Sequence, residues 1–364
     1  MALLLTPARG ATAPPSPAGG AGQEQAASAP ARQWLKVPRV KGRLGAGELG
    51  LVINTADPYS VEVGEFYAKA RNIAPEHILR VELPVRAELT LPEFERLHAR
   101  LVEHFGPAGE GPVQAYALAW QRPFAVECQS INGVLAQGFD AGLCRRTCAA
   151  TRPSRYFNSP SVRPAADHAL RLSMLLAAAD VASAKALIAR GVAADRSLGL
   201  RGAPPVVAHF AVTDDKVRSV RERLFPPDGA IPKLGVQVRS GVREPPSAGD
   251  RVLLYQTGTA RVAPLDAVRF VPGALADHLT SFGGWLDGGQ GQTSALQWIQ
   301  AGATASYGTV SEPCNHLQKF PHPQVLLLHY LQGSTAIEAY WRSVAWPQQG
   351  VFIGEPLSAP FARP

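Results

Sequence analysis

An apolar run, a helix and a second apolar run follow one another early in the chain. Residues 49–54 (LGLVIN) are apolar and end in a polar turn, which is typical of a buried strand. Residues 61–71 carry apolar side chains at helical spacing, and Ser60 stands where it can cap that helix. Residues 78–83 return to a strand pattern. A strand–helix–strand unit predicts a parallel sheet and an α/β fold.

The same alternation continues to the C-terminus. We expect further helices at 91–105, 165–179 and 182–190, and in KVRSVRERLF, QTSALQWIQ and STAIEAYWRSV. Apolar runs predict strands at 113–120, 204–212 and 302–307, and in DRVLLYQTG, AVRFVPGALADHL and GVFIGEPL. Residues from about 121 to 170 break the alternation with prolines and three of the four cysteines, and we interpret them as an irregular insertion.

The N-terminal residues have a different composition. Pro, Ala, Gly and Ser dominate up to about Ala31, so this part offers too little apolar surface to offset its ordering entropy. We predict that residues 1–43 are disordered and that 44–364 form a single domain. The opening MALLL is too short, and lacks the basic start, for an ordinary signal peptide unless the true start lies upstream.

Composition and charge exclude several classes of partner. The net charge is +7, but the basic residues are scattered, and no Lys/Arg block with interleaved aromatics indicates nucleic-acid binding. No apolar run approaches the length that a transmembrane helix needs. No glycine-rich phosphate loop of the usual spacings occurs, since GGQGQ at 288–292 lacks the lysine, and we predict no cofactor.

Polar residues gather where the predicted strands end. In open α/β sheets, ligands bind outside the carboxyl ends of parallel strands. We therefore predict a cleft there. Its residues are Asn54, Asp57, Thr257, Gly258, His278, Thr280, Ser281, Gly283, Glu312 and His316.

The stretch DHLTSFGG at 277–284 crowds the side chains of hydrolase chemistry into one short segment. Ser281 or Thr280 is a candidate nucleophile with His278 as its base. Catalytic triads are normally assembled from distant segments, however, so this local crowding is weak evidence. Two further interpretations stay open: a turn whose two glycines adopt positive φ, and a binding site without catalysis.

The four cysteines allow several states. Cys144 and Cys148 are four residues apart, but no second pair completes a zinc site. A disulfide among Cys128, Cys144 and Cys148 is a second alternative, and free thiols are the third. Cys314 stands near Glu312 and His316 and is a further candidate nucleophile.

Several distinctive stretches span most of the chain from about Gly47. They are LRLSMLLAAAD, AKALIARGVAAD, LTSFGG, QWIQAGATASYGTVSEP, FPHP, GSTAIEAYWRSV and FIGEPLSAPF. Together they resemble an uncharacterised bacterial protein family found in species that carry the exosortase protein-sorting system. This resemblance implies a secreted or periplasmic protein, with a cytoplasmic location as the alternative.

More distantly, the layout resembles the gingipain-type peptidases of the caspase-like fold. That resemblance implies a three-layer α/β/α sandwich in which one strand ends in Gly-His-Gly and another in the nucleophilic Cys. Here LLYQTGT occupies the position of the Gly-His-Gly element and has no His. LTSFGG occupies the position of the Cys element, and it has Ser281 where that family has Cys. IGEPL carries Glu355 where that family has Asp.

These departures remove the Cys–His dyad on which thiolate catalysis depends. We therefore expect a pseudoenzyme that binds a peptide, glycan or protein partner in an exosortase-linked envelope process. The alternative is a hydrolase, of peptidase or esterase type, that uses Ser281 or Thr280. We also predict that the Glu312 carboxylate faces the same cavity as Ser281.

Overall fold

The computed structural model describes residues 32–288 and 290–363. They form an α/β structure around one large sheet of eleven strands, with a small second sheet of three. The strands of the large sheet are β1 (Leu49–Asn54), β2 (Ile78–Val81), β4 (Ala115–Leu118), β7 (Leu172–Leu175), β8 (Val206–Ala211), β9 (Gly229–Ile231), β10 (Val236–Val242), β11 (Val252–Gly258), β12 (Phe270–Leu279), β13 (Ala305–Thr309) and β14 (Gly350–Gly354). The small sheet consists of β3 (Glu88–Leu89), β5 (Ala125–Val126) and β6 (Gln129–Ser130).

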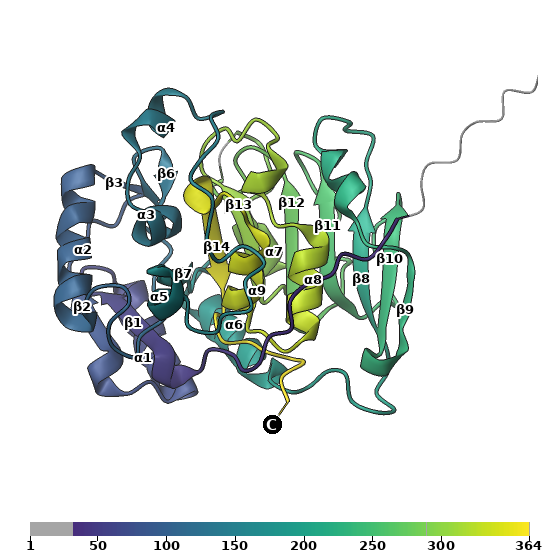
Figure 1. The fold of residues 1–364 in the computed structure, drawn as a ribbon, viewed down its shortest axis with the longest axis horizontal. Coiled ribbons are helices and arrows are strands. Elements are labelled where there is room, and N and C mark those ends of the chain that lie inside the picture. Colours follow the sequence, from purple (N-terminus) through teal and green to yellow (C-terminus); the bar gives the residue numbers. More distant parts are fainter. Residues whose placement is uncertain (1–31, 289, 364) are drawn as a thin grey trace, which may run out of the picture. The chain divides into compact units, whose positions relative to one another are not determined.

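The helices connect these strands and flank the large sheet (Figure 1). They are α1 (Pro58–Arg71), α2 (Leu91–Phe105), α3 (Ile131–Gln137), α4 (Ala141–Arg145), α5 (Pro164–His168), α6 (Val181–Ala194), α7 (Ala295–Gln300), α8 (Pro323–Leu331) and α9 (Ala336–Ser343). Short 3-10 turns are η1 (Ala46–Glu48), η2 (Pro75–His77), η3 (Ser219–Leu224), η4 (Pro232–Leu234), η5 (Leu317–Lys319) and η6 (Pro347–Gln349). Within the described ranges, none of the helices has both the length and the apolar character to span a bilayer.

The large sheet reverses direction once in its interior. Its strand order is β2-β1-β4-β7-β14-β13-β12-β11-β8-β10-β9. Strands β2 to β14 in this order are mutually parallel and form the first half-sheet, and strands β13 to β10 are mutually parallel and form the second half-sheet. Strands β14 and β13 pair antiparallel. The carboxyl ends of the two half-sheets therefore lie at opposite edges.

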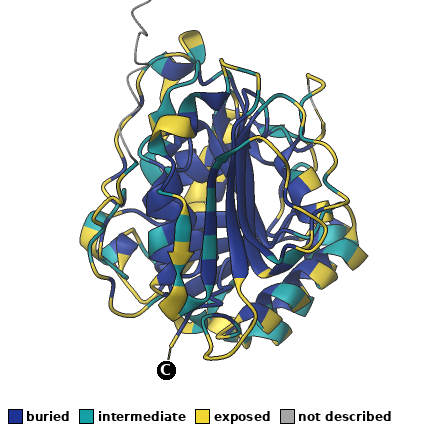
Figure 2. Ribbon diagram, turned by 90° about the vertical axis from the view of Figure 1, so that its right-hand side faces the viewer, coloured by how far each residue is buried: buried dark blue, intermediate teal, exposed yellow. Residues whose placement is uncertain are grey.

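Helices cover both sides of the large sheet (Figure 2). One layer contains α1, α6 and α7, in which α1 packs on α6 and Arg190 of α6 donates to the carbonyl of Ile299 in α7. The other contains α3 and α9, which contact β7 and β14, and α8, which packs on α9. The arrangement is compatible with the predicted three-layer sandwich, and the predicted α/β class with a mostly parallel sheet is confirmed.

Most predicted elements exist, and the errors have a physical cause. The helix predicted at 165–179 is wrong, because that range contains the short α5 and then strand β7. All four β7 residues are buried, and a short, mostly apolar run does not distinguish a buried helix from a central strand. The basic helix predicted after β8 is the 3-10 turn η3, and β9, β10 and α8 were not predicted.

The segment predicted as an irregular insertion has an ordered structure. Between residues 121 and 170 it contains β5, β6 and helices α3 to α5, and α3 packs against β7 and β14. Two disulfides join Cys128 to Cys144 and Cys148 to Cys314. The free-thiol, zinc-site and Cys314-nucleophile interpretations are therefore wrong, since all four cysteines are bonded in pairs.

Residues 32–43 form an extended strap across α8, although the sequence had placed them in the disordered segment. The Gln324 side chain accepts from the Leu35 amide at 2.6 Å and donates to the Gln33 carbonyl at 3.2 Å. The Gln332 side chain accepts from the Val40 amide and donates to the Pro38 carbonyl. The described domain thus begins at Arg32 rather than at the predicted residue 44, and residues 1–31 of the predicted disordered segment lie outside the described residues.

Two glycines, Gly284 and Gly308, allow the loop after β12 to approach β13 closely. A Cβ at Gly308 would overlap the backbone of Gly283 and Gly284, and a Cβ at Gly284 would overlap the Gly308 carbonyl. Neither Gly283 nor Gly284 has positive φ, so the expectation of left-handed turn residues there is wrong. These glycines are required for the close approach of two backbones.

We predict that Gly308→Ala destabilises the protein by about 1–3 kcal/mol or more, because the added methyl group overlaps backbone atoms that cannot rotate away. Gly249→Ala is the matched control, since nothing lies within 4 Å of the position that its added methyl group would occupy. Chemical denaturation of the oxidised protein measures both free energies of unfolding. Equal stability of the two variants would contradict the described packing of the loop on β13.

Candidate functional site

The carboxyl ends of β11 and β12 lie side by side in the second half-sheet. Thr257 pairs with His278 and Gly258 with Leu279 in a parallel register. The stretches YQTGT and LTSFGG, which are about twenty residues apart in the sequence, are therefore neighbours at one edge of the sheet. The loops that follow β8 and β13 leave the sheet at the same edge, because these strands are parallel to β11 and β12.

Asn54 and Asp57 do not belong to this edge. They follow β1 of the first half-sheet, whose carboxyl end lies at the opposite edge. The Asn54 side chain bonds the backbone N–H and C=O of Leu83, at 2.9 and 3.1 Å, and Asp57 caps α1 through the Tyr59 amide. Both side chains therefore form hydrogen bonds to backbone groups near β1, and the structure does not bring them close to the other predicted cleft residues.

A buried ion pair lies beneath the ends of β11 and β12. The Asp277 carboxylate accepts from the Arg221 guanidinium and, at 2.7 Å, from the Gln256 amide. Arg221 also donates to the Thr257 carbonyl at 2.9 Å and to the Pro321 carbonyl at 3.4 Å. Burial raises the pKa of the Asp277 carboxyl, and the Arg221 charge and the Gln256 hydrogen bond act against this rise.

His278 faces away from Asp277, since consecutive residues of a strand point to opposite sides of the sheet. Its Nδ1 accepts from the Trp298 indole N–H of α7 at 3.0 Å. The ring is fully buried, and burial lowers the pKa of His278 to about 3. The proton of this neutral ring therefore resides on Nε2, and the lone pair of Nδ1 is already occupied. The imidazole has no free lone pair with which to act as a base.

Thr280 and Ser281 follow β12 in the loop that packs on β13. The Thr280 hydroxyl donates to Gln292 at 2.6 Å, and the same Gln292 oxygen accepts from the Phe282 amide at 2.9 Å. The Arg218 guanidinium donates to the Thr280 hydroxyl at 3.3 Å. The Thr280 hydroxyl is thus committed to holding the loop.

Ser281 has no base among the described residues. Its side chain is 9% exposed, and across 32–288 and 290–363 its hydroxyl has no hydrogen-bond partner. Its carbonyl accepts from the Thr309 hydroxyl at 2.9 Å. A serine nucleophile needs a base within hydrogen-bond reach and a group that orients the base. The structure therefore does not assemble His278, Thr280 and Ser281 into a dyad or triad.

The loop after β13 holds the remaining predicted residues. The Glu312 carboxylate accepts from the Cys314 amide at 2.8 Å, two residues along the same turn. His316 contacts the Cys148 carbonyl through Nε2 at 2.8 Å. None of these contacts joins Glu312 to Ser281, and the predicted shared cavity stays a prediction.

Residues that were not singled out in the sequence connect the site. Arg218 and Arg221 belong to the basic stretch after β8. A further buried cation, Lys319, donates to the Thr147 carbonyl at 2.7 Å, and burial lowers its pKa to about 8. The only sequence signal for the arginines was their spacing of three residues within KVRSVRERLF.

Comparison with known proteins gives no relative from which a role could be carried over. No family model, curated protein sequence or solved structure matches the chain. The function proposed below therefore depends on the contacts of the described residues and on the sequence resemblance.

We predict that the protein loses stability in acid partly through His278. Its folded-state pKa of about 3 lies below the ordinary value of 6.5, so the unfolded state binds the proton more tightly. The free energy of unfolding should fall by about 1.4 kcal/mol per pH unit for this group as the pH drops from about 6.5 toward about 3.

The test compares His278→Gln with the unaltered protein by urea denaturation between pH 4 and pH 7. The glutamine oxygen can still accept from the Trp298 indole, but it does not titrate. We expect a shallower dependence of stability on pH for the variant. Identical slopes would contradict the buried, neutral state of His278.

Proposed function

We propose that the ends of β11, β12 and β13 form the ligand-binding site of a peptidase-like pseudoenzyme. In this proposal the domain has a caspase-like fold, and it binds a peptide, glycan or protein partner in an exosortase-linked envelope process. The observation that carries the proposal is the parallel pairing of YQTGT with LTSFGG, the two stretches that resemble the His and Cys elements of gingipain-type peptidases.

The chemistry of the two strand ends supports binding without hydrolysis. YQTGT has no histidine, and the hydroxyl of Ser281 has no base among the residues of the described ranges. The histidine of the same stretch, His278, is buried against Trp298, with its Nδ1 occupied by the indole N–H. An unassisted serine hydroxyl is a weak nucleophile.

The terminal motif also supports the resemblance in layout without supporting catalysis. Glu355 follows β14 and is fully buried. Its carboxylate accepts from the Tyr67 hydroxyl at 2.8 Å and forms a two-pronged ion pair with Arg71 of α1. Glu355 thus fixes α1 to the sheet, at the edge opposite to Ser281.

The two disulfides favour an envelope location. Disulfides form and persist in oxidising compartments such as the periplasm and the extracellular space, and they are rare in the cytosol. Cys148–Cys314 joins segments 166 residues apart, so it constrains the loop after β13 as well as the segment before α5. This observation supports a secreted or periplasmic protein.

We predict that a fluorophosphonate probe does not label the folded protein, because Ser281 lacks a base. In-gel fluorescence after incubation with the probe measures labelling, with a known serine hydrolase in the same tube as the positive control. Ser281→Ala and Thr280→Val are the paired variants. Labelling of the unaltered protein that persists in Thr280→Val and disappears in Ser281→Ala would overturn the pseudoenzyme proposal in favour of a serine hydrolase.

A further inference from the structure

The disulfide Cys148–Cys314 links two parts of the chain that are distant in the sequence. Cys148 lies in the segment between α4 and α5, and Cys314 lies in the loop after β13, 166 residues later. The second disulfide, Cys128–Cys144, spans only 16 residues. The first disulfide is thus a covalent link between distant segments of the fold, whereas the second closes one small loop.

The two disulfides differ in their exposure to solvent. Cys148 is exposed and Cys314 is partly buried, whereas Cys128 and Cys144 are both partly buried. The buried Gln129 side chain also donates a hydrogen bond to the Cys144 sulfur at 3.6 Å. Thiol–disulfide exchange begins when a thiolate attacks one sulfur of the bond, so its rate depends on access to that sulfur. A reductant in solution should therefore react at Cys148 before it reacts at the other disulfide.

The backbone around Cys314 is strained. Cys314 and Asn315 both have a φ of 54°, which is in the left-handed region. Asparagine is enriched in this region, but cysteine is not. The Glu312 carboxylate accepts from the Cys314 amide at 2.8 Å, and His316 contacts the Cys148 carbonyl at 2.8 Å. A strained backbone persists only where the surrounding structure holds it, and the disulfide is the covalent part of that support.

The end of this loop has support that does not depend on the disulfide. Lys319 is fully buried, and its side chain donates to the Thr147 carbonyl at 2.7 Å. The Lys319 carbonyl accepts from the Tyr307 hydroxyl of β13. Opening the disulfide should therefore loosen the loop up to Gln318 and leave the chain from Lys319 onward in place.

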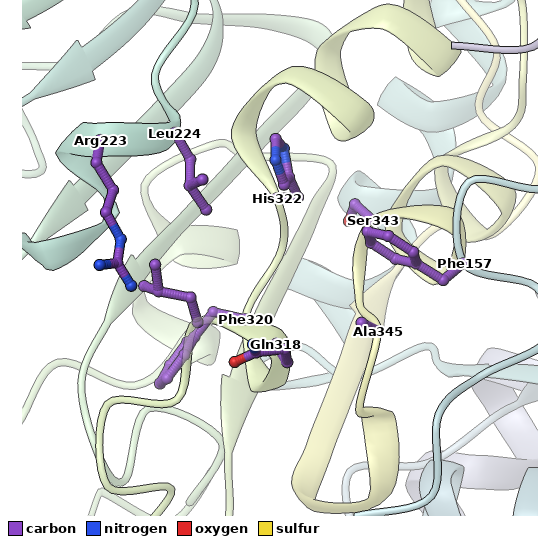
Figure 3. Close-up of a pocket in the computed structure, with 9 residues that line it drawn as sticks. Phe157, Arg223, Leu224, Gln318, Phe320, His322, Ser343 and Ala345 are labelled. Carbon is purple, nitrogen blue, oxygen red and sulfur yellow. The ribbon is translucent and has the colours of Figure 1, made fainter. Parts of the chain in front are cut away.

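The same loop forms part of the wall of a cavity of about 270 Å³ (Figure 3). Leu317 and Gln318 line the cavity from this loop, and Phe157 lines it from the segment before α5. η3 contributes Leu224 and Arg223, whose guanidinium has no ion-pair partner within the described ranges. The disulfide therefore joins two of the segments that enclose the cavity, and its opening should alter the cavity wall.

We propose that Cys148–Cys314 is a redox switch that a dithiol opens, and that its opening releases residues 312–318. A thiolate of the dithiol attacks the Cys148 sulfur, the bond between the two cysteines breaks, and Cys314 leaves as a thiolate. The second thiol of the reductant then attacks the mixed disulfide and releases Cys148. Two electrons and two protons pass to the cysteines, and the dithiol becomes a disulfide. This switch goes beyond the proposed function and does not depend on it.

A time course of reduction of the full chain tests which disulfide opens first. The protein is treated with dithiothreitol, free thiols are blocked with iodoacetamide, and the remaining disulfides are then reduced and labelled with N-ethylmaleimide. Peptide mass spectrometry gives the reduced fraction of each cysteine. We expect Cys148 and Cys314 to be reduced about tenfold faster than Cys128 and Cys144, because Cys148 is exposed. Equal rates, or faster reduction of Cys128–Cys144, would overturn the proposal.

Hydrogen–deuterium exchange tests whether the opening releases the loop. In protein reduced only at Cys148–Cys314, we expect amides of residues 312–318 to exchange about tenfold faster than in the oxidised protein. Peptides that cover α8 should keep their exchange rate, because Lys319 holds the chain before them. Unchanged exchange at 312–318 after this reduction would show that the disulfide does not control the loop.

Two double variants distinguish this switch from a general effect of losing a disulfide. Cys148→Ser with Cys314→Ser should exchange rapidly at 312–318 without any reductant. Cys128→Ser with Cys144→Ser is the matched control and should exchange slowly there until dithiothreitol is added. Equal exchange at 312–318 in the two variants without reductant would contradict the assignment. Should either variant fail to fold, the two measurements on the unaltered protein decide the question.

Discussion

The contact on which the site depends most is the buried pair of Arg221 and Asp277. One guanidinium holds a carboxylate of β12, a carbonyl of β11 and the Pro321 carbonyl of the loop that leads to α8. Removing one partner of a buried ion pair typically costs about 3–5 kcal/mol, because the other charge stays in a medium that solvates it poorly. Three chain segments thus share a single electrostatic anchor. The cavity lined by Phe320 and His322 borders Pro321, which this anchor holds.

The antiparallel pairing of β13 and β14 places the carboxyl ends of the two half-sheets at opposite edges of the large sheet. At the carboxyl edge of the first half-sheet, Asn54 and Asp57 satisfy backbone groups, and at the nearby end of β14 Glu355 binds Arg71. At the carboxyl edge of the second half-sheet, hydroxyls and a free guanidinium remain without carboxylate partners among the described residues. At the first edge these side chains therefore hold structure, whereas at the second edge Thr280 and Asp277 are bonded within the protein and the Ser281 hydroxyl has no partner within the described ranges.

The sequence predicted much of this fold but little of the site. Helix α2 was predicted because its apolar residues recur at helical spacing, and strand β1 because a short apolar run ends in a polar turn. Strand β7 was mistaken for helix, because a short, fully buried run carries no period that distinguishes strand from helix. The reversal at β14 leaves no local trace, so Asn54 and Ser281 were assigned to one cleft. Arg221 and Asp277 are 56 positions apart, and the sequence spacing of residues does not predict such a long-range ion pair. The Cys148–Cys314 disulfide was missed for the same reason, whereas Cys128–Cys144 is among the disulfides that the sequence had left open.

The strap of residues 32–43 is mechanically connected to η3 through Gln324. The Gln324 amide that holds the Gln33 carbonyl also donates, at 3.3 Å, to the carbonyls of Leu224 and Phe225 at the end of η3. Arg32 adds an ion pair with Glu222 of the same turn. A force applied to the N-terminal side of the strap, by a tether or a moving partner, would therefore act directly on the turn that carries Leu224 and Arg223. Tension at the N-terminal end of the domain is thus transmitted to the cavity that Arg223 and Leu224 line.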